Sequence, residues 1–114
     1  MIKVGDIAFV EFPFEEKRAD RLHPVLVLDV QAHNQCVVAY GTSKQVDRHC
    51  PRKREVVIAD EEHLKQVGLS RPTRFDVGLR ARIFVPRRSL VGKLPVPLHG
   101  CLYRAAVECG LLGG

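Results

Sequence analysis

The sequence predicts a β-rich α+β domain, built on a small and strongly curved antiparallel sheet with one short helix and a C-terminal helix. Short runs of β-forming residues follow one another along the chain, with turn residues between them. These runs do not alternate with helical patterns, which argues against a parallel sheet. The 114 residues have the length of one domain, so we expect a single domain over 1–114.

Six segments have the length and composition of short strands. Val25–Val30 is a continuous apolar run, which predicts a strand buried on both faces. A turn at 33–35 would join it to the next strand as a hairpin. The expected strands are Asp6–Pro13, Val25–Val30, Cys36–Tyr40, Glu55–Ile58, Thr73–Asp76 and Ala81–Val85.

Two segments predict helices. Asp60 is placed to cap a short helix that runs through Val67, and Gly68 would end it. In the last quarter of the chain, apolar residues recur at positions that share one helical face. These residues are Leu98, Leu102, Ala105 and Cys109.

Composition narrows the classes of function. The chain is 46% hydrophobic and 27% charged, which is typical of a folded domain and not of a disordered one. No apolar run reaches the roughly 20 residues of a membrane span, and no secretion signal is evident, so we expect a soluble cytoplasmic protein. Neither a Gly-rich phosphate loop nor a G-x-S-x-G motif occurs. An enzyme of this size would work with a few side chains, and a groove shared by two copies would enlarge its site.

Four cysteines raise the question of disulfides or a metal. We expect free thiols, because the cytosol keeps cysteines reduced. The pairs His49-Cys50 and His99-Gly100-Cys101 leave a zinc-binding regulator open as an alternative. Their spacing is not that of common structural zinc sites, and no C-x-x-C pair is present. The sequence therefore predicts no metal and no cofactor.

The positive charge is concentrated in one part of the chain. Residues 1–43 carry four basic and six acidic residues, whereas residues 44–114 carry fourteen basic and seven acidic ones. Most of the basic residues are arginines, whose planar guanidinium suits phosphate and stacks on bases. This pattern favours nucleic acid as a partner, with an acidic protein surface as the alternative.

Polar residues at strand ends supply groups that metal-free RNA cleavage needs. His23 precedes a predicted strand, Thr42 and Ser43 end another, and Arg74 and Asp76 share a strand face. A base would take the proton of the ribose 2′-OH, a cation would stabilise the phosphorane, and an acid would protonate the leaving oxygen. The alternatives are a loop histidine, ordinary turn residues and a surface ion pair between Arg74 and Asp76.

The order of these segments resembles the MazF/PemK family of toxins from toxin–antitoxin pairs. The resemblance spans most of residues 4–88, and the last quarter of the chain matches only as a generic tail with a helix. The matching segments are Val4-Gly5-Asp6-Ile7, Glu11-Phe12-Pro13-Phe14, His23-Pro24-Val25-Leu26-Val27-Leu28, Val38-Ala39-Tyr40-Gly41-Thr42-Ser43 and Gly68-Leu69-Ser70-Arg71-Pro72-Thr73-Arg74-Phe75-Asp76.

The resemblance implies an SH3-like barrel, a homodimer and a metal-independent endoribonuclease that cuts single-stranded RNA. The products would carry 2′,3′-cyclic phosphate and 5′-hydroxyl ends, and an antitoxin with an acidic, flexible segment would block the site. Thr42 matches the family's active-site threonine, and Arg74 and Asp76 resemble its Arg-x-Asp acid–base pair. His23 stands where the family usually has a catalytic arginine, a departure for which Arg21 is a possible substitute.

These expectations define the residues to be located in the structure. Either Asp76 or His23 would serve as base, Arg74 as acid or charge stabiliser, and Thr42 as a phosphate ligand. The residues expected to bind the RNA strand are Arg21, Ser43, Arg52, Lys53, Arg54 and Arg71. The alternative function is a catalytically weak SH3-like module that binds nucleic acid or an acidic protein segment.

Overall fold

The computed structural model describes residues 1–11, 22–46 and 52–111. Within these residues, six strands and two helices follow one another, with three-residue 3-10 segments at 32–34, 87–89 and 96–98. The elements are β1 (Asp6–Glu11), β2 (Leu22–Val30), β3 (Gln35–Thr42), β4 (Glu55–Ile58), α1 (Glu61–Gln66), β5 (Thr73–Phe84), β6 (Leu90–Lys93) and α2 (His99–Glu108).

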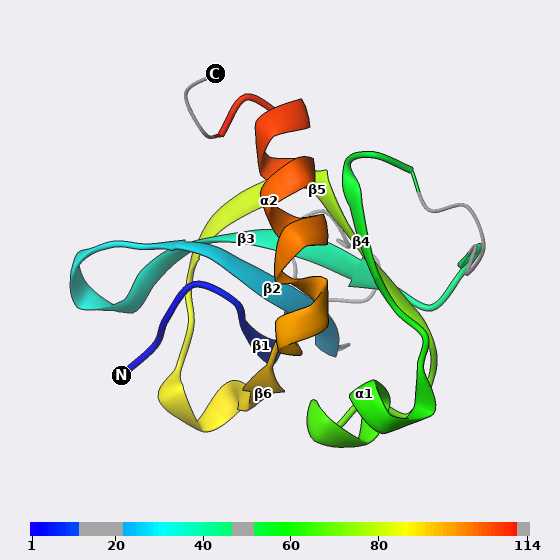
Figure 1. The fold of residues 1–114 in the computed structure, drawn as a ribbon. Coiled ribbons are helices and arrows are strands. Elements are labelled where there is room, and N and C mark those ends of the chain that lie inside the picture. Colours follow the sequence, from blue (N-terminus) through cyan, green and yellow to red (C-terminus); the bar gives the residue numbers. More distant parts are fainter. Residues whose placement is uncertain (12–21, 47–51, 112–114) are drawn as a thin grey trace.

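The strands form one antiparallel sheet in the order β4-β5-β3-β2-β1-β6, curled into a half-barrel (Figure 1). The predicted β-rich α+β class is confirmed. Neighbours in the chain are neighbours in the sheet for β1, β2 and β3, and β2 and β3 form the expected hairpin. His33 and Asn34 take up positive φ angles of 61° and 58° in that hairpin, which allows the chain to reverse there.

β5 corrects the sequence prediction, because Thr73–Asp76 and Ala81–Val85 are parts of one twelve-residue strand that ends at Phe84. Its register against β3 shifts between Ala39, which pairs with Arg80, and Tyr40, which pairs with Asp76. The extra residues bulge out, and a bulge bends a strand without ending it. Residues 77–79 have no partner in β3, so the strand pattern of the sequence is interrupted there.

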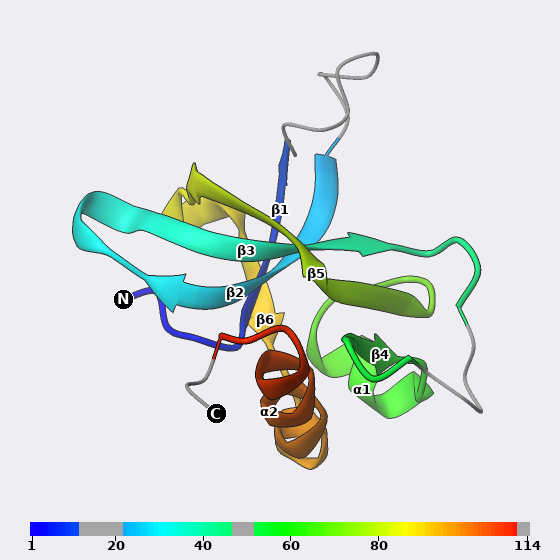
Figure 2. The ribbon, with the colours of Figure 1, turned by 90° about the horizontal axis from the view of Figure 1, so that it is seen from above.

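Two cores lie on the two faces of the curled sheet. The larger one joins Leu26 and Ala39 of the sheet to Leu64 of α1 and Ala105 of α2. Figure 2 shows both helices on the same side of β2, β3 and β5. Of the four residues of the predicted helical face, Ala105 is buried in this core, and Leu98, Leu102 and Cys109 are partly buried and pack against it. The other core lies across the sheet, around Val25, Val27, Cys36 and Val38.

The cap predicted for α1 is confirmed, whereas the start of β2 and the presence of β6 differ from the predictions. The Asp60 carboxylate caps α1 by accepting bonds from the backbone amides of Glu62 at 2.9 Å and His63 at 3.3 Å. β2 begins at Leu22, three residues earlier than predicted, so His23 is a strand residue and not a loop residue. β6 was not predicted at all, and it forms an edge of the sheet beside β1.

Candidate functional site

A cavity of about 440 Å³ opens where β2 begins and β3 ends. Four of the residues predicted for the site line it: His23, Thr42, Ser43 and Arg71. Apolar and other polar side chains complete the wall, so the cavity offers both a surface for stacking and groups for hydrogen bonding. The remaining lining residues are Phe9, Leu22, Pro24, Tyr40, Gly41, Lys44, Leu69, Ser70 and Thr73.

The pairing of β2 with β3 brings His23 and Thr42 together. Val25 and Tyr40 are cross-strand partners, so His23, two residues before Val25, and Thr42, two residues after Tyr40, lie on the same face. The rings of His23 and Tyr40 lie 5.2 Å apart with a tilt of 44°. His23 Nε2 is buried, and no residue within 1–11, 22–46 and 52–111 bonds to it.

Gly41 allows this close approach of the two strands. A Cβ atom at this position would lie 2.5 Å from the backbone oxygen of Pro24 and 2.7 Å from Cε1 of Phe75. No side chain other than hydrogen fits between them, because one obstacle is backbone and the other is a fully buried ring. The close packing therefore requires a glycine at this position of the cavity lining.

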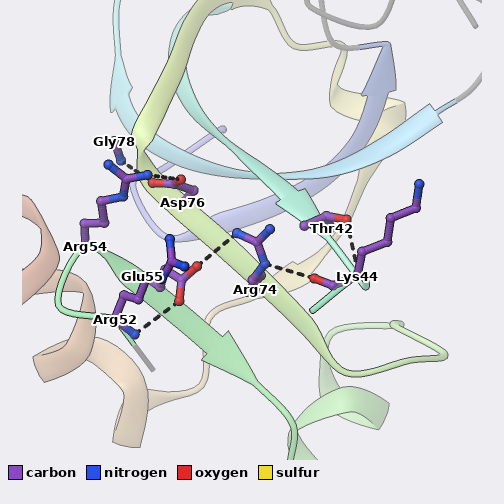
Figure 3. Close-up of polar contacts among 8 residues, drawn as sticks. All are labelled: Thr42, Lys44, Arg52, Arg54, Glu55, Arg74, Asp76 and Gly78. Carbon is purple, nitrogen blue, oxygen red and sulfur yellow. Dashed lines mark hydrogen bonds and ion pairs between the residues drawn. The ribbon is translucent and has the colours of Figure 1, made fainter. Parts of the chain in front are cut away.

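Arg74 does not line this cavity, but it lies close to Thr42 and Lys44, which do (Figure 3). It is the cross-strand partner of Thr42, so the two side chains share one face of the sheet. Its Nε donates to the backbone oxygen of Lys44 at 2.9 Å, and its Nη1 donates to Glu55 Oε2 at 2.9 Å. The guanidinium is held from two sides.

Asp76 is likewise outside the cavity lining, and it is bonded at both carboxylate oxygens. Oδ2 accepts from Arg54 Nη2 at 3.1 Å, and Oδ1 accepts from the backbone amide of Gly78 at 2.8 Å. The sequence left open a surface ion pair between Arg74 and Asp76. Each of them pairs instead with a residue at the start of β4, Arg74 with Glu55 and Asp76 with Arg54.

The basic segment Arg52, Lys53 and Arg54 is exposed and leads directly into β4. Its amide at Arg52 donates to Glu55 Oε1 at 3.1 Å, so this segment is tied to the same carboxylate that holds Arg74. Arg21, His49 and Cys50 lie outside the described residues. Through Glu55 and Arg54, the basic segment stands next to Arg74 and Asp76.

Glu55 is the residue of this site that sequence reasoning missed. Only 6% of its surface is exposed, although it follows three consecutive basic residues. An isolated acid between a basic run and an apolar strand was the available signal, because buried carboxylates need cationic partners. The cross-strand register that supplies Arg74 could not be derived from that pattern alone.

The described residues contain no group of three or more His, Cys, Asp or Glu side chains that could hold a metal ion. Cys36, Cys101 and Cys109 are free thiols. Burial raises the pKa of the Cys36 thiol, and the negative charges of Asp29 and Asp6 raise it further. No helix in the described part of the chain combines the length and apolar character that crossing a membrane requires.

Comparison with solved structures identifies the architecture. An endoribonuclease in complex with its cognate antitoxin, from mycobacterial species, superposes with a TM-score of 0.65 over 100% of this chain and 99% of that chain, at 10% identity. The fold is that of a toxin endoribonuclease. An Mtb toxin superposes with a TM-score of 0.54, covering 76% of this chain and 91% of that chain at 21% identity. No family model and no curated protein sequence matches the chain. The toxin endoribonuclease fold is thus recognisable from the backbone at low sequence identity.

Proposed function

We propose that the protein is the toxin of a type II toxin–antitoxin system and cleaves single-stranded RNA without a metal ion. The observation that carries this proposal is the cavity at the β2–β3 end, on a fold shared with a toxin endoribonuclease over the whole chain. It combines a histidine, a threonine hydroxyl and exposed basic residues next to an anchored arginine. These are the groups that a reaction driven by the ribose 2′-OH requires.

Of the two candidates for the base, the imidazole of His23 is better placed than the carboxylate of Asp76. It lines the cavity, and its Nε2 has no bond partner within the described part of the chain. Asp76 lies outside the cavity, and both of its oxygens are occupied. In the proposed reaction His23 takes the proton of the 2′-OH, the resulting oxygen attacks phosphorus, and the bond to the 5′ oxygen breaks. The products are a 2′,3′-cyclic phosphate and a 5′-hydroxyl.

Thr42 and Arg74 would act on the phosphate. The Thr42 hydroxyl accepts a bond from the Lys44 amide at 3.2 Å, which leaves its proton free to point at a phosphate oxygen. Arg74 carries a permanent positive charge across the strand from Thr42, where it would stabilise the phosphorane. The leaving 5′ oxygen would take its proton from water. Ser43, Arg71, Arg52, Lys53 and Arg54 would bind the flanking strand.

An antitoxin would block this site with an acidic, flexible segment. The exposed basic residues 52–54 offer the complementary charge, and one similar solved structure is an endoribonuclease in complex with its cognate antitoxin. We further propose that two copies form a homodimer, which would enlarge the RNA-binding surface of so small a domain.

The deciding test is incubation of the purified protein with single-stranded RNA in excess EDTA, followed by mapping of both ends of each product. We expect cyclic phosphate and 5′-hydroxyl ends, cleavage reduced at least about 100-fold in Thr42→Val, and unchanged cleavage in Arg104→Ala on the exposed side of α2. Cleavage that requires a divalent ion, or products with 5′-phosphate ends, would contradict the mechanism.

The second candidate is a binding module of the same fold with little or no catalysis. The engagement of Arg74 and Asp76 in separate ion pairs outside the cavity favours it. It predicts binding of RNA or of an acidic peptide that weakens steeply with salt, gives no product and survives Thr42→Ala. The EDTA experiment separates the two candidates directly.

A further inference from the structure

Glu55 joins three parts of the site through one buried carboxylate. Oε2 accepts from Arg74 of β5, and Oε1 accepts from the amide of Arg52 in the basic segment (Figure 3). Glu55 itself begins β4 and is 6% exposed. A carboxylate so placed has no access to RNA, so any influence on RNA must pass through the groups that it holds.

We propose that Glu55 is a positioning residue of the RNA-cleaving site, which fixes the Arg74 guanidinium beside Thr42 and fixes the Arg52–Arg54 segment next to it. This inference rests on the proposed function and names a residue that neither the fold comparison nor the sequence motifs assign. It makes β4 and the segment before it part of the functional site.

The geometry of Arg74 supports this role. An arginine side chain has several rotatable bonds, but two bonds at Nε and Nη1, in different directions, fix the plane of its guanidinium. Within residues 1–11, 22–46 and 52–111, Nη2 makes no hydrogen bond, so one donor of the oriented group remains for a ligand. Orientation before the substrate arrives is what makes a charge effective in catalysis.

The contact between Glu55 and Arg74 is a diagonal one in the pairing of β4 with β5. Glu55 is the Cα partner of Asp76, and Val57 is the partner of Arg74. The Glu55 side chain therefore reaches diagonally along the ladder to Arg74. The backbone oxygen of Lys44, which lies beyond the end of β3, accepts the second hydrogen bond of Arg74 from the opposite side. Arg74 is thus held between the continuation of β3 and the start of β4.

The test uses Glu55→Gln in the full chain, with Glu108→Gln on exposed α2 as the matched control. Glutamine keeps one acceptor oxygen, so it can serve Arg74 or the Arg52 amide but not both, and it has no charge. We expect kcat to fall about tenfold with KM changed less than about twofold, because Arg74 is mispositioned in the transition state. The control should match the unaltered protein in both constants.

Two further measurements distinguish positioning from a purely structural role. In an Arg74→Lys background, Glu55→Gln should cause no additional loss of kcat, because its effect acts through the guanidinium. In NMR spectra, the Arg74 Nε–Hε signal should be protected from solvent exchange in the unaltered protein and lose that protection in Glu55→Gln. An additive loss of kcat in the double variant, or unchanged protection of the signal, would overturn the proposal.

The same design keeps this inference separate from the proposed function. If the unaltered protein gives no RNA product, the proposed function fails, and Glu55 as a positioning residue for cleavage fails with it. The Nε–Hε measurement then still reports whether Glu55 orients Arg74. If cleavage occurs but kcat is unchanged in Glu55→Gln, only the positioning inference is overturned.

Discussion

Glu55 and Asp76 face each other as cross-strand partners in β4 and β5, and both residues are buried, with 6% and 7% of the whole-residue surface exposed. Like charges directly opposite in a ladder are destabilising. Two arginines offset this repulsion in a crossed arrangement, in which Arg74 pairs with Glu55 and Arg54 pairs with Asp76. The stability of this end of the sheet therefore depends on cations that also stand at the proposed RNA site.

The two arginines should contribute unequally to stability. The Arg74 side chain is 21% exposed and its partner 7%, whereas the Arg54 side chain is 51% exposed. We expect Arg74→Met to lower the free energy of unfolding by about 3 kcal/mol, because it leaves a buried charge unpaired. Arg54→Met should lower it by less than about 1 kcal/mol, because water screens that pair.

Urea unfolding at low and at high NaCl checks this difference. The effect of Arg54→Met should shrink in 1 M NaCl, where the screening length is only about 3 Å. The effect of Arg74→Met should persist. Equal losses in the two variants, or equal sensitivity to salt, would contradict the assignment of the two pairs.

Gly41→Ala should disrupt the packing of the strands that line the cavity. The added methyl group would meet the Pro24 backbone oxygen and the buried Phe75 ring, neither of which can move away easily. We expect a loss of at least about 2 kcal/mol in the free energy of unfolding. The control is Gly100→Ala in α2, where nothing lies within 4 Å of the added atom. That change should be neutral or stabilise the helix by up to about 1 kcal/mol, so a destabilised control would argue against the steric explanation.

The features that the sequence predicted correctly depend on neighbouring residues. Asp60 caps α1 through amides two and three positions away, and the apolar face of α2 follows from spacing along one helix. Such signals are complete within a short window. The proximity of His23 and Thr42 could also be predicted, because both lie at the ends of strands that form one hairpin.

The features that the sequence did not predict depend on distant partners. Leu90–Lys93 is a strand because β1 offers it a free edge, and nothing in the four residues themselves requires that. The continuity of β5 through Gly78 depends on a long bulge, stabilised by a bond from the Gly78 amide to Asp76. The role of Glu55 depends on the register of β4 against β5. Local patterns carry no information about these pairings.

Cys36 should make stability fall at alkaline pH. Its pKa is raised by burial and then by the charges of Asp29 and Asp6, so the folded protein keeps the thiol proton to a higher pH than the unfolded chain does. The stability linked to this proton is complete below the unfolded pKa of about 8.5 and is lost as the pH rises through the folded value.

Cys36→Val removes this titration while filling a similar buried volume. Relative to this variant, the unaltered protein should lose free energy of unfolding above about pH 8.5, measured by urea unfolding. Exposure also predicts that a thiol reagent modifies Cys101 before Cys36, since Cys36 is fully buried. A parallel decline of the two proteins with pH would remove Cys36 as the cause.

Substitutions at His23 distinguish proton transfer from charge stabilisation at that position. If the imidazole is the base, His23→Gln should reduce cleavage at least about 100-fold, since general-base catalysis contributes about that much or more. His23→Arg should then fail to restore activity, because a guanidinium does not accept a proton at neutral pH. If the position needs a cation to hold phosphate, as the family resemblance implies, arginine should instead match or exceed the histidine. Measuring the cleavage rate of the three proteins on one RNA, with unfolding curves to confirm that each is folded, decides between these roles. Greater activity in the arginine variant would exclude His23 as the base and return that role to Asp76.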